Sequence, residues 1–231
     1  MQGKNELYRL SFFLNVTPKT LEKLWSAGSI KQFPRGHILM RARDKVDQVY
    51  IQLSGKSMVY NLTHTGRRKI IFIYGEGALL NEHMLYEHAA SLFCETLEKS
   101  SIFAVSKKLF QKCMEEDFTL TSAVLKQQEW RLWRMGHQLK NTLGSVGMKQ
   151  KLAAKLWKLS RDFGIQRPDG VEIDLNLSVT MLADMLGASR ENTSRLCSEL
   201  VDLGLLKIQK RRITITDQEK IADFYKTGKM E

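Results

Sequence analysis

Four polar side chains suited to reading DNA bases follow a serine near the end of the chain. Ser189 can cap a helix, and one face of that helix would carry Arg190, Glu191, Ser194 and Arg195. The opposite face would carry Thr193, Leu196, Cys197 and Leu200. Arginine can donate two hydrogen bonds to guanine, glutamate can accept one from cytosine, and serine can bond a base edge or a phosphate. The pattern predicts a helix that packs on one side and recognises DNA on the other.

The flanking residues predict a helix-turn-helix followed by a basic hairpin. Ser178 can cap a first helix, Gly187-Ala188 supplies a tight turn, and Ser189 caps the second helix. A hairpin over 206–216 would turn at Lys210-Arg211 and form a wing. The side chains expected at phosphates are Ser178, Ser189, Lys207, Lys210, Arg211 and Arg212. A solvated hairpin with no DNA contact is the alternative.

Upstream of this unit, the same reasoning predicts a helix that ends at Gly164 and a half-buried strand over 171–177. Two glycines, Gly144 and Gly147, interrupt the helical pattern before it and predict a hinge. Residues 148–231 therefore form a predicted winged helix-turn-helix domain.

A heptad stripe before the hinge predicts a long helix over 108–144. The predicted seam consists of Phe118, Leu125, Leu132, Met135 and Leu139. Because no other segment of the chain has a matching heptad, the stripe indicates pairing with a second copy in a homodimer. The alternative is a helix packed on its own β-domain, and Trp130 and Trp133 would suit that packing.

Short β-type runs separated by glycine turns occupy the chain from about residue 28 to residue 106. Their spacing favours a small antiparallel β-roll over a parallel sheet with helical crossovers. The predicted fold class is α+β, with a β-roll effector-sensing domain over 1–107, the dimerisation helix over 108–144 and the winged domain.

Composition excludes several classes of protein. Of 231 residues, 43% are hydrophobic, but no apolar run approaches the roughly 20 residues of a membrane span, and the N-terminus lacks the features of a signal peptide. A cytoplasmic protein without a membrane partner is expected. Cys94, Cys113 and Cys197 contain no C-x-x-C pair, which favours buried free thiols. A role for these thiols in redox control stays open.

The net charge of +11 suggests an acidic partner but does not locate its binding face. Residues 148–231 hold 15 basic residues against 12 acidic ones, whereas residues 190–212 hold six against three. Phosphate contacts require a local excess of positive charge, and the segment around the predicted reading helix has one.

No catalytic or metal-binding motif is present, so neither an enzyme nor a metal site is expected. A protein-binding module whose helix-turn-helix does not touch DNA remains an alternative.

The order of β-roll, long helix, glycine hinge and winged helix-turn-helix resembles the CRP/FNR family of bacterial transcription regulators. Arg190, Glu191 and Arg195 match the base readers of the cyclic-AMP receptor type, while Glu191, Ser194 and Arg195 match the E-x-x-S-R signature of the FNR type. The resemblance implies a palindromic operator with half-sites close to TGTGA or TTGAT, and RNA polymerase as a further partner. Both signatures are satisfied, so the choice of half-site stays open.

The sensing half departs from its relatives. In cyclic-nucleotide members an arginine neutralises the cyclic phosphate, and here Ala90 stands in its place. We therefore expect no tight binding of cyclic AMP. An iron–sulfur cluster needs four thiolates, and the chain has three cysteines, none before Cys94. Haem through His37, His83 or His88 is not expected, although a haem- or redox-responsive regulator and a constitutive DNA-binding protein remain alternatives.

What remains is a small organic effector and no required cofactor. Residues 76–82 loosely resemble those of the halogenated-phenol regulators, the CprK-like branch. The predicted pocket would suit an aromatic acid or phenol, with allosteric control of the DNA-binding domain. Its residues are Tyr74, Leu79, Leu80, Asn81, Leu92, Lys126 and Trp130. The alternative is that these are ordinary core or surface residues.

Overall fold

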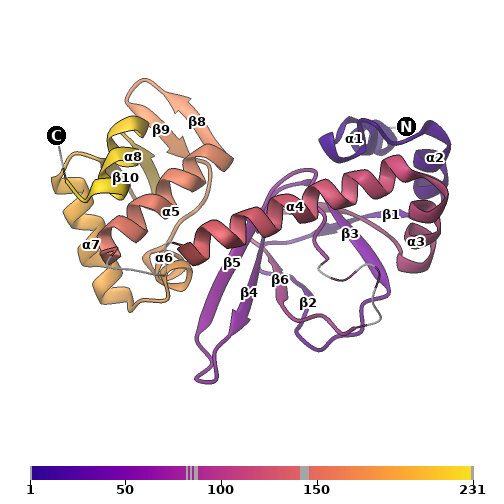
Figure 1. Ribbon diagram of the computed structural model, residues 1–231, viewed down its shortest axis with the longest axis horizontal. Coiled ribbons are helices and arrows are strands. Elements are labelled where there is room, and N and C mark those ends of the chain that lie inside the picture. The colour runs from indigo at the N-terminus through magenta and orange to yellow at the C-terminus, as the bar shows by residue number, and fades with distance from the viewer. Residues whose placement is uncertain (1, 82, 84, 86–87, 141–145, 230–231) are drawn as a thin grey trace. The chain divides into compact units, whose positions relative to one another are not determined.

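The computed structural model describes residues 2–81, 83, 85, 88–140 and 146–229, and the side chains of 5–139 and 146–229 within those ranges. They form two units, Met1–Met135 and Gly136–Glu231. Figure 1 shows their helices and strands in chain order. The predicted α+β class is confirmed.

Two antiparallel sheets make up the roll of the first unit. The first has the order β1-β7-β3, from Ser29–Phe33, Ser100–Ser106 and Gln48–Ser54. The second has the order β2-β6-β4-β5, from Ile38–Met40, Phe93–Thr96, Ser57–Leu62 and Arg68–Tyr74. Gly55, with φ 79°, makes the turn between β3 and β4, where a Cβ would lie 2.6 Å from the Lys99 carbonyl oxygen. The predicted β-roll is confirmed.

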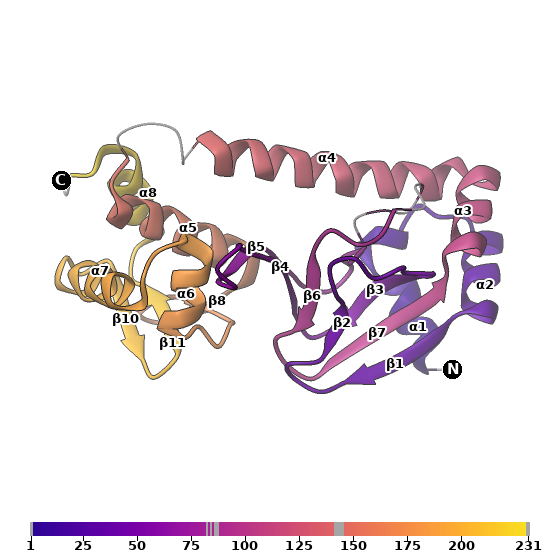
Figure 2. The same cartoon turned by 90° about the horizontal axis from the view of Figure 1, so that it is seen from below.

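Three short helical elements precede the roll, and the sequence analysis did not predict them. They are α1 (Gln2–Arg9), the 3₁₀ helix η1 (Ser11–Phe13) and α2 (Pro18–Ala27). Leu7, Leu10 and Leu24 are fully or almost fully buried in one cluster with Ile51 and Phe103 of the roll. These helices gather at the same end of the roll as α3, as Figures 1 and 2 show. They therefore close the core that the strands leave open.

The long helix predicted over 108–144 is interrupted at Asp117. The structure has α3 over Lys107–Glu116 and α4 over Phe118–Lys140, and Asp117 between them is extended, with φ −134° and ψ 100°. Its carboxylate accepts hydrogen bonds from the Thr119 backbone N–H at 2.9 Å and from Thr17 Oγ1 at 2.6 Å. Because a carboxylate at the start of a helix satisfies free N–H groups, Asp117 begins α4 as a new helix. Residues 141–144 of the prediction lie outside the described residues.

The hydrogen bonds to Asp117 also act on its protonation. Burial alone would raise the pKa of this carboxyl, but the donors from Thr119 and Thr17 outweigh burial and hold the pKa well below its usual range. Asp117 is thus an anion that fastens the start of α2 to the start of α4.

The second unit combines four helices with one four-stranded antiparallel sheet among its described residues. After the last residues of α4 come α5 (Met148–Phe163), β8 (Gly164–Arg167) and β9 (Gly170–Ile173). Then come α6 (Val179–Leu186), α7 (Arg190–Asp202), β10 (Leu206–Gln209), β11 (Arg212–Ile215) and α8 (Gln218–Thr227). The sheet order is β10-β11-β9-β8. Strand pairing and helix order are those of a winged helix-turn-helix.

Most boundaries predicted for this unit are close to those observed. The first helix ends at Gly164, where a Cβ would lie 2.1 Å from the Ser160 carbonyl oxygen. The strand predicted over 171–177 is shorter, because β9 ends at Ile173 and Leu177 instead donates its N–H to the Arg211 carbonyl. The sequence analysis predicted neither β8 nor α8.

Helices in the described part of the chain are too short or too polar to span a membrane. None of the helices there combines the length and apolar character that crossing a bilayer requires.

Candidate DNA-binding site and effector pocket

Helices α6 and α7 form the predicted helix-turn-helix. Ser178 Oγ accepts a hydrogen bond from the Met181 N–H, and Ser189 Oγ accepts one from the Asn192 N–H, both at 3.1 Å. Gly187 ends α6 in the left-handed conformation, with φ 75°. Both predicted caps and the glycine turn are therefore confirmed.

The two faces of α7 also follow the prediction. Thr193, Leu196, Cys197 and Leu200 are buried. The exposed face carries Arg190, Glu191, Ser194 and Arg195. The structure thus brings all four predicted base readers together on one solvent-facing surface at the start of α7.

Two neighbours on α7 hold Arg195, and the sequence analysis missed both. Its Nη1 donates to Glu199 Oε1 at 2.8 Å, and its Nη2 donates to Asn192 Oδ1 at 3.0 Å. The spacings are i+4 and i−3, which place three side chains on one helical face. That spacing was the signal that could have identified them.

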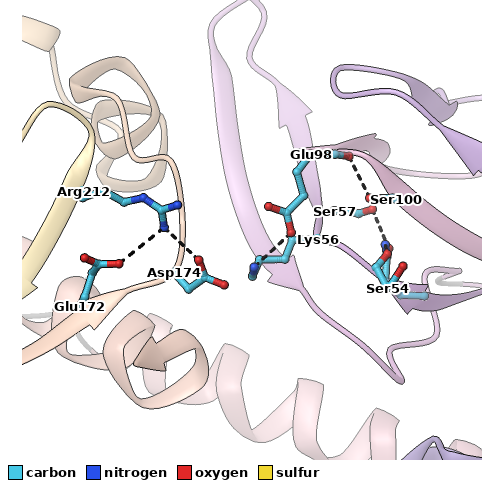
Figure 3. Close-up of polar contacts among 9 residues, drawn as sticks. Ser54, Lys56, Ser57, Glu98, Ser100, Glu172, Asp174 and Arg212 are labelled. Carbon is cyan, nitrogen blue, oxygen red and sulfur yellow. Dashed lines mark hydrogen bonds and ion pairs between the residues drawn. The ribbon is translucent and has the colours of Figure 1, made fainter. Parts of the chain in front are cut away.

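The predicted wing is the hairpin of β10 and β11, which turns at Lys210 and Arg211. Both of these side chains are exposed. Lys207 pairs with Asp169 at 3.0 Å. Figure 3 shows Arg212, which pairs with Asp174 at 2.9 Å and with Glu172 at 3.9 Å. Hydrogen bonding to Lys207 lowers the pKa of Asp169. The tip of the wing is therefore its most available cationic part, since Lys207 and Arg212 already have carboxylate partners.

The residues predicted to line an effector pocket do not form one common surface. Leu79 is buried in the cluster that includes the N-terminal helices, whereas Tyr74 and Leu80 belong to a second cluster, against which Leu92 packs. Lys126 is exposed, and the exposed Trp130 contacts Phe72 at a ring distance of 6.3 Å. The predicted set thus divides between buried positions of the roll and exposed positions of α4, and its role in binding an effector stays a prediction.

Asn81 has a structural role within the roll. Its Oδ1 accepts the Tyr50 N–H at 2.7 Å, and its Nδ2 donates to the Gln48 carbonyl at 2.8 Å. The side chain therefore satisfies backbone groups at the start of β3, and both ends of its amide are already engaged.

A small pocket lies elsewhere on the first unit. It is lined by Met40, Val46, Asn81, His83, His88 and Ala90. The His83 and His88 rings are 6.1 Å apart and nearly perpendicular. One of its lining residues is Ala90, the position at which the resemblance implies an arginine in cyclic-nucleotide members. Of the predicted effector residues, Asn81 is the one that lines it.

Helix α4 is bound to residues 77–81 by two polar side chains one turn apart, which we call the α4 clamp: Gln127 and Arg131. Gln127 accepts the Leu79 N–H at 3.0 Å and donates to the Gly77 carbonyl at 2.7 Å. Arg131 donates to the carbonyls of Asn81, at 2.9 Å, and Leu79, and it lies 4.8 Å from the Tyr74 ring centroid. Arg131 is buried, with 7% exposure. The sequence alone gave no sign that this arginine of the predicted helix is buried.

The predicted seam lies on the exposed side of α4. Its members are 46% to 76% exposed, and they are Phe118, Leu125, Leu132, Met135 and Leu139. Leu120 and Val124 are the α4 residues that pack into the roll. Helix α4 thus packs on its own β-domain, as the alternative held, but it does so through this other side, and the seam residues stay exposed. Pairing of the seam with a second copy remains a prediction.

The remaining predicted sites give a mixed result. Gly147 precedes α5 and donates its N–H to Gln150 Oε1 at 3.1 Å, while Gly144 lies outside the described residues. Cys94, Cys113 and Cys197 are free and buried, as predicted. In the described ranges, no group of three or more His, Cys, Asp or Glu side chains is placed to hold a metal ion.

Comparison with known families gives two matches that occupy different parts of the chain. A model of the cyclic nucleotide-binding domain matches residues 30–117. A model of the Crp-like helix-turn-helix domain matches residues 150–224. The first match corresponds to the roll with α3, and the second to the unit that carries α6 and α7.

Known proteins with both parts are similar over most of their length. The chain is 28% identical over 189 residues to the global nitrogen regulator of Synechococcus elongatus. The aligned region covers 80% of this chain and 85% of that protein. The chain is 21% identical to a CRP-like cAMP-activated global transcriptional regulator of Mycobacterium tuberculosis over 94% of this chain and 96% of that one. A solved structure of CprK complexed with OCPA matches with a TM-score of 0.64 at 16% identity, over 88% and 94% of the two chains.

Proposed function

The chain belongs to the CRP/FNR family of DNA-binding transcription regulators, and from this we propose that it binds a palindromic operator as a homodimer under the control of a small-molecule effector. The exposed face of α7 carries this proposal, because four side chains with base-reading chemistry lie together there. Glu191 and Arg195 would read the C·G pair of the half-site and its neighbour. The half-site is TTGAT or TGTGA.

Arg195→Ala tests the reading of DNA directly. We expect operator affinity to fall by about 1 to 3 kcal/mol, or roughly 5- to 150-fold, because a base-reading arginine supplies discrimination of that size. The measurement is a mobility shift on TTGAT/ATCAA and TGTGA/TCACA palindromes at fixed salt. Lys220→Ala, which removes one exposed positive charge from α8, is the control. Equal affinity of Arg195→Ala and the unaltered protein would favour a module that binds protein instead of DNA.

The homodimer in this proposal is supported by the exposed seam of α4. Two helix-turn-helix units can occupy successive major grooves only if they are about 34 Å apart, one turn of DNA. A pair of α4 helices in contact through the seam would fix two copies relative to each other. RNA polymerase is the further partner that we propose for the DNA-bound form, in line with the family.

The effector is proposed to act on the first unit through the α4 clamp. The pocket at Asn81, His83 and Ala90 adjoins the backbone that Gln127 and Arg131 hold. A ligand that binds one conformation of this backbone more tightly than another favours that conformation. Because α4 is hydrogen-bonded to the same backbone, it would move together with it. We propose an aromatic acid or phenol and no required cofactor. A thermal-shift screen of such compounds, followed by DNA binding, would identify it, and binding that no ligand alters would indicate a constitutive protein.

Cyclic AMP is expected not to be this effector. Ala90 stands where the resemblance implies the arginine that pairs with a cyclic phosphate, and a charge-assisted pair is roughly twice as strong as a neutral hydrogen bond. Calorimetric titration of protein already shown to bind DNA should therefore detect no complex at micromolar cyclic AMP. A dissociation constant in that range or tighter would contradict this expectation and align the chain with the mycobacterial cAMP-activated regulator.

A further inference from the structure

The guanidinium of Arg195 is fixed at both of its terminal nitrogens by side chains of α7. Glu199 holds Nη1 and Asn192 holds Nη2, yet the side chain remains 69% exposed. Each terminal nitrogen of arginine carries two N–H groups, so each can keep one for a ligand. The fork is therefore held in one orientation while retaining two donors for a base.

Glu199 uses its second oxygen on a different helix. Its Oε2 lies 2.6 Å from Lys149 Nζ, and Lys149 is the second residue of α5. A cation in the first turn of a helix is disfavoured by the helix dipole, so Lys149 benefits from this carboxylate. Hydrogen bonding to Lys149 lowers the pKa of Glu199, which favours the charged carboxylate. One anion thus bridges the base-reading helix and the start of α5.

We infer that Glu199 is a positioning residue that sets how selectively Arg195 reads its base, and that Lys149 makes this depend on the position of the first turn of α5. The inference rests on the proposed function, since it needs Arg195 to contact DNA. Helix α5 begins immediately after Gly147. A displacement of its first turn would therefore reach Arg195 through two ion pairs, without any change in the backbone of α7.

The two effects of Glu199 on DNA binding have opposite signs. As a positioning residue it favours the correct base pair, because a fixed arginine fork loses less freedom on binding. As an anion beside the reading face it repels phosphates of any sequence. Removing its charge should therefore lower discrimination and raise non-specific affinity, whereas loss of a merely structural contact would weaken both forms of binding together.

The test uses the full chain and two DNA duplexes, the operator and the same operator with the shared G·C pair of one half-site reversed. In the unaltered protein the reversal should cost about 5- to 150-fold in affinity. We call the affinity for the operator divided by the affinity for the reversed duplex the discrimination ratio. In Glu199→Gln this ratio should fall roughly 5-fold, because part of the base readout is lost. Affinity for unrelated DNA should rise about 2-fold. Lys149→Met should lower the ratio in the same direction by a smaller factor.

Two further variants separate position from charge. Glu199→Asp keeps the anion but shortens its reach, so the ratio should fall with no gain in non-specific affinity. Asp223→Asn removes one negative charge from α8 and should leave the ratio unchanged. Thermal unfolding of each variant checks that the unit remains folded.

The outcomes distinguish the inference from the proposed function. An unchanged ratio in both Glu199→Gln and Glu199→Asp, with Arg195→Ala still impaired, would overturn the inference and leave the proposed function intact. If Arg195→Ala binds the operator as well as the unaltered protein, the proposed function fails first and the inference with it.

Discussion

Replacement of Leu125 and Leu132 by glutamate is expected to convert the protein to a monomer and to weaken operator binding at least about 100-fold, the factor that linked binding sites typically contribute. Both leucines lie on the exposed seam of α4, with exposures of 51% and 72%. In a symmetric dimer each glutamate would face the same seam of the second copy, where its charge would be buried without a partner. Light scattering would report the mass, and mobility shifts the affinity.

The appropriate control is another exposed leucine. Leu62 on β4 is 43% exposed and lies outside the seam, so Leu62→Glu should remain dimeric and keep its affinity for the operator. Binding to a single half-site should be similar in all three proteins, because the reading face of α7 is unaltered. A dimeric double variant would show that the seam is not the contact between copies.

Arg131→Met is expected to destabilise the first unit by about 2 to 4 kcal/mol, because it leaves two buried backbone carbonyls without their donor. In the present fold these are the carbonyls of Leu79 and Asn81. A loss of this size lowers the melting temperature of a domain of this size by roughly 10 °C. Differential scanning calorimetry is the direct measurement.

Arg134→Met is the matched control for this variant. Arg134 lies three residues farther along α4, with its guanidinium 4.7 Å from the Trp130 ring centroid. The cation–π contact of this half-buried arginine contributes about 0.5 to 1 kcal/mol, less than the loss expected at Arg131, so the melting temperature should fall less. Equal losses in the two variants would mean that the clamp contributes nothing beyond the packing of an arginine stem.

The parts of the structure that follow from local sequence were predictable. The caps Ser178 and Ser189 and the inner stripe of α7 depend on residues within a few positions of each other, and the structure reproduces them. The seam of α4 was predictable for the same reason, because it follows from a repeat of seven residues along the sequence. Sequence reasoning therefore located the candidate reading face by residue number.

The parts that depend on distant residues were not predictable. The break at Asp117 relies on Thr17, one hundred positions earlier. The sequence pattern does not distinguish Arg131 from an exposed charged residue of a helix. Its burial depends on its hydrogen bonds to residues 77–81, which are distant in the sequence. Leu79 and Leu80 are apolar in a core and in a ligand pocket alike, so the pattern alone gave no means to tell the two apart.

The turn of the wing also has an energetic consequence. Lys210 adopts φ 58°, the left-handed region that glycine enters freely and that costs other residues about 1 to 2 kcal/mol. Its neighbour Arg211 is exposed beside it. The tip thus combines two adjacent positive charges with a strained backbone, so the turn costs more free energy than a glycine turn would. Contact with a polyanion would relieve the repulsion between these charges, and the wing should become more ordered when DNA is bound.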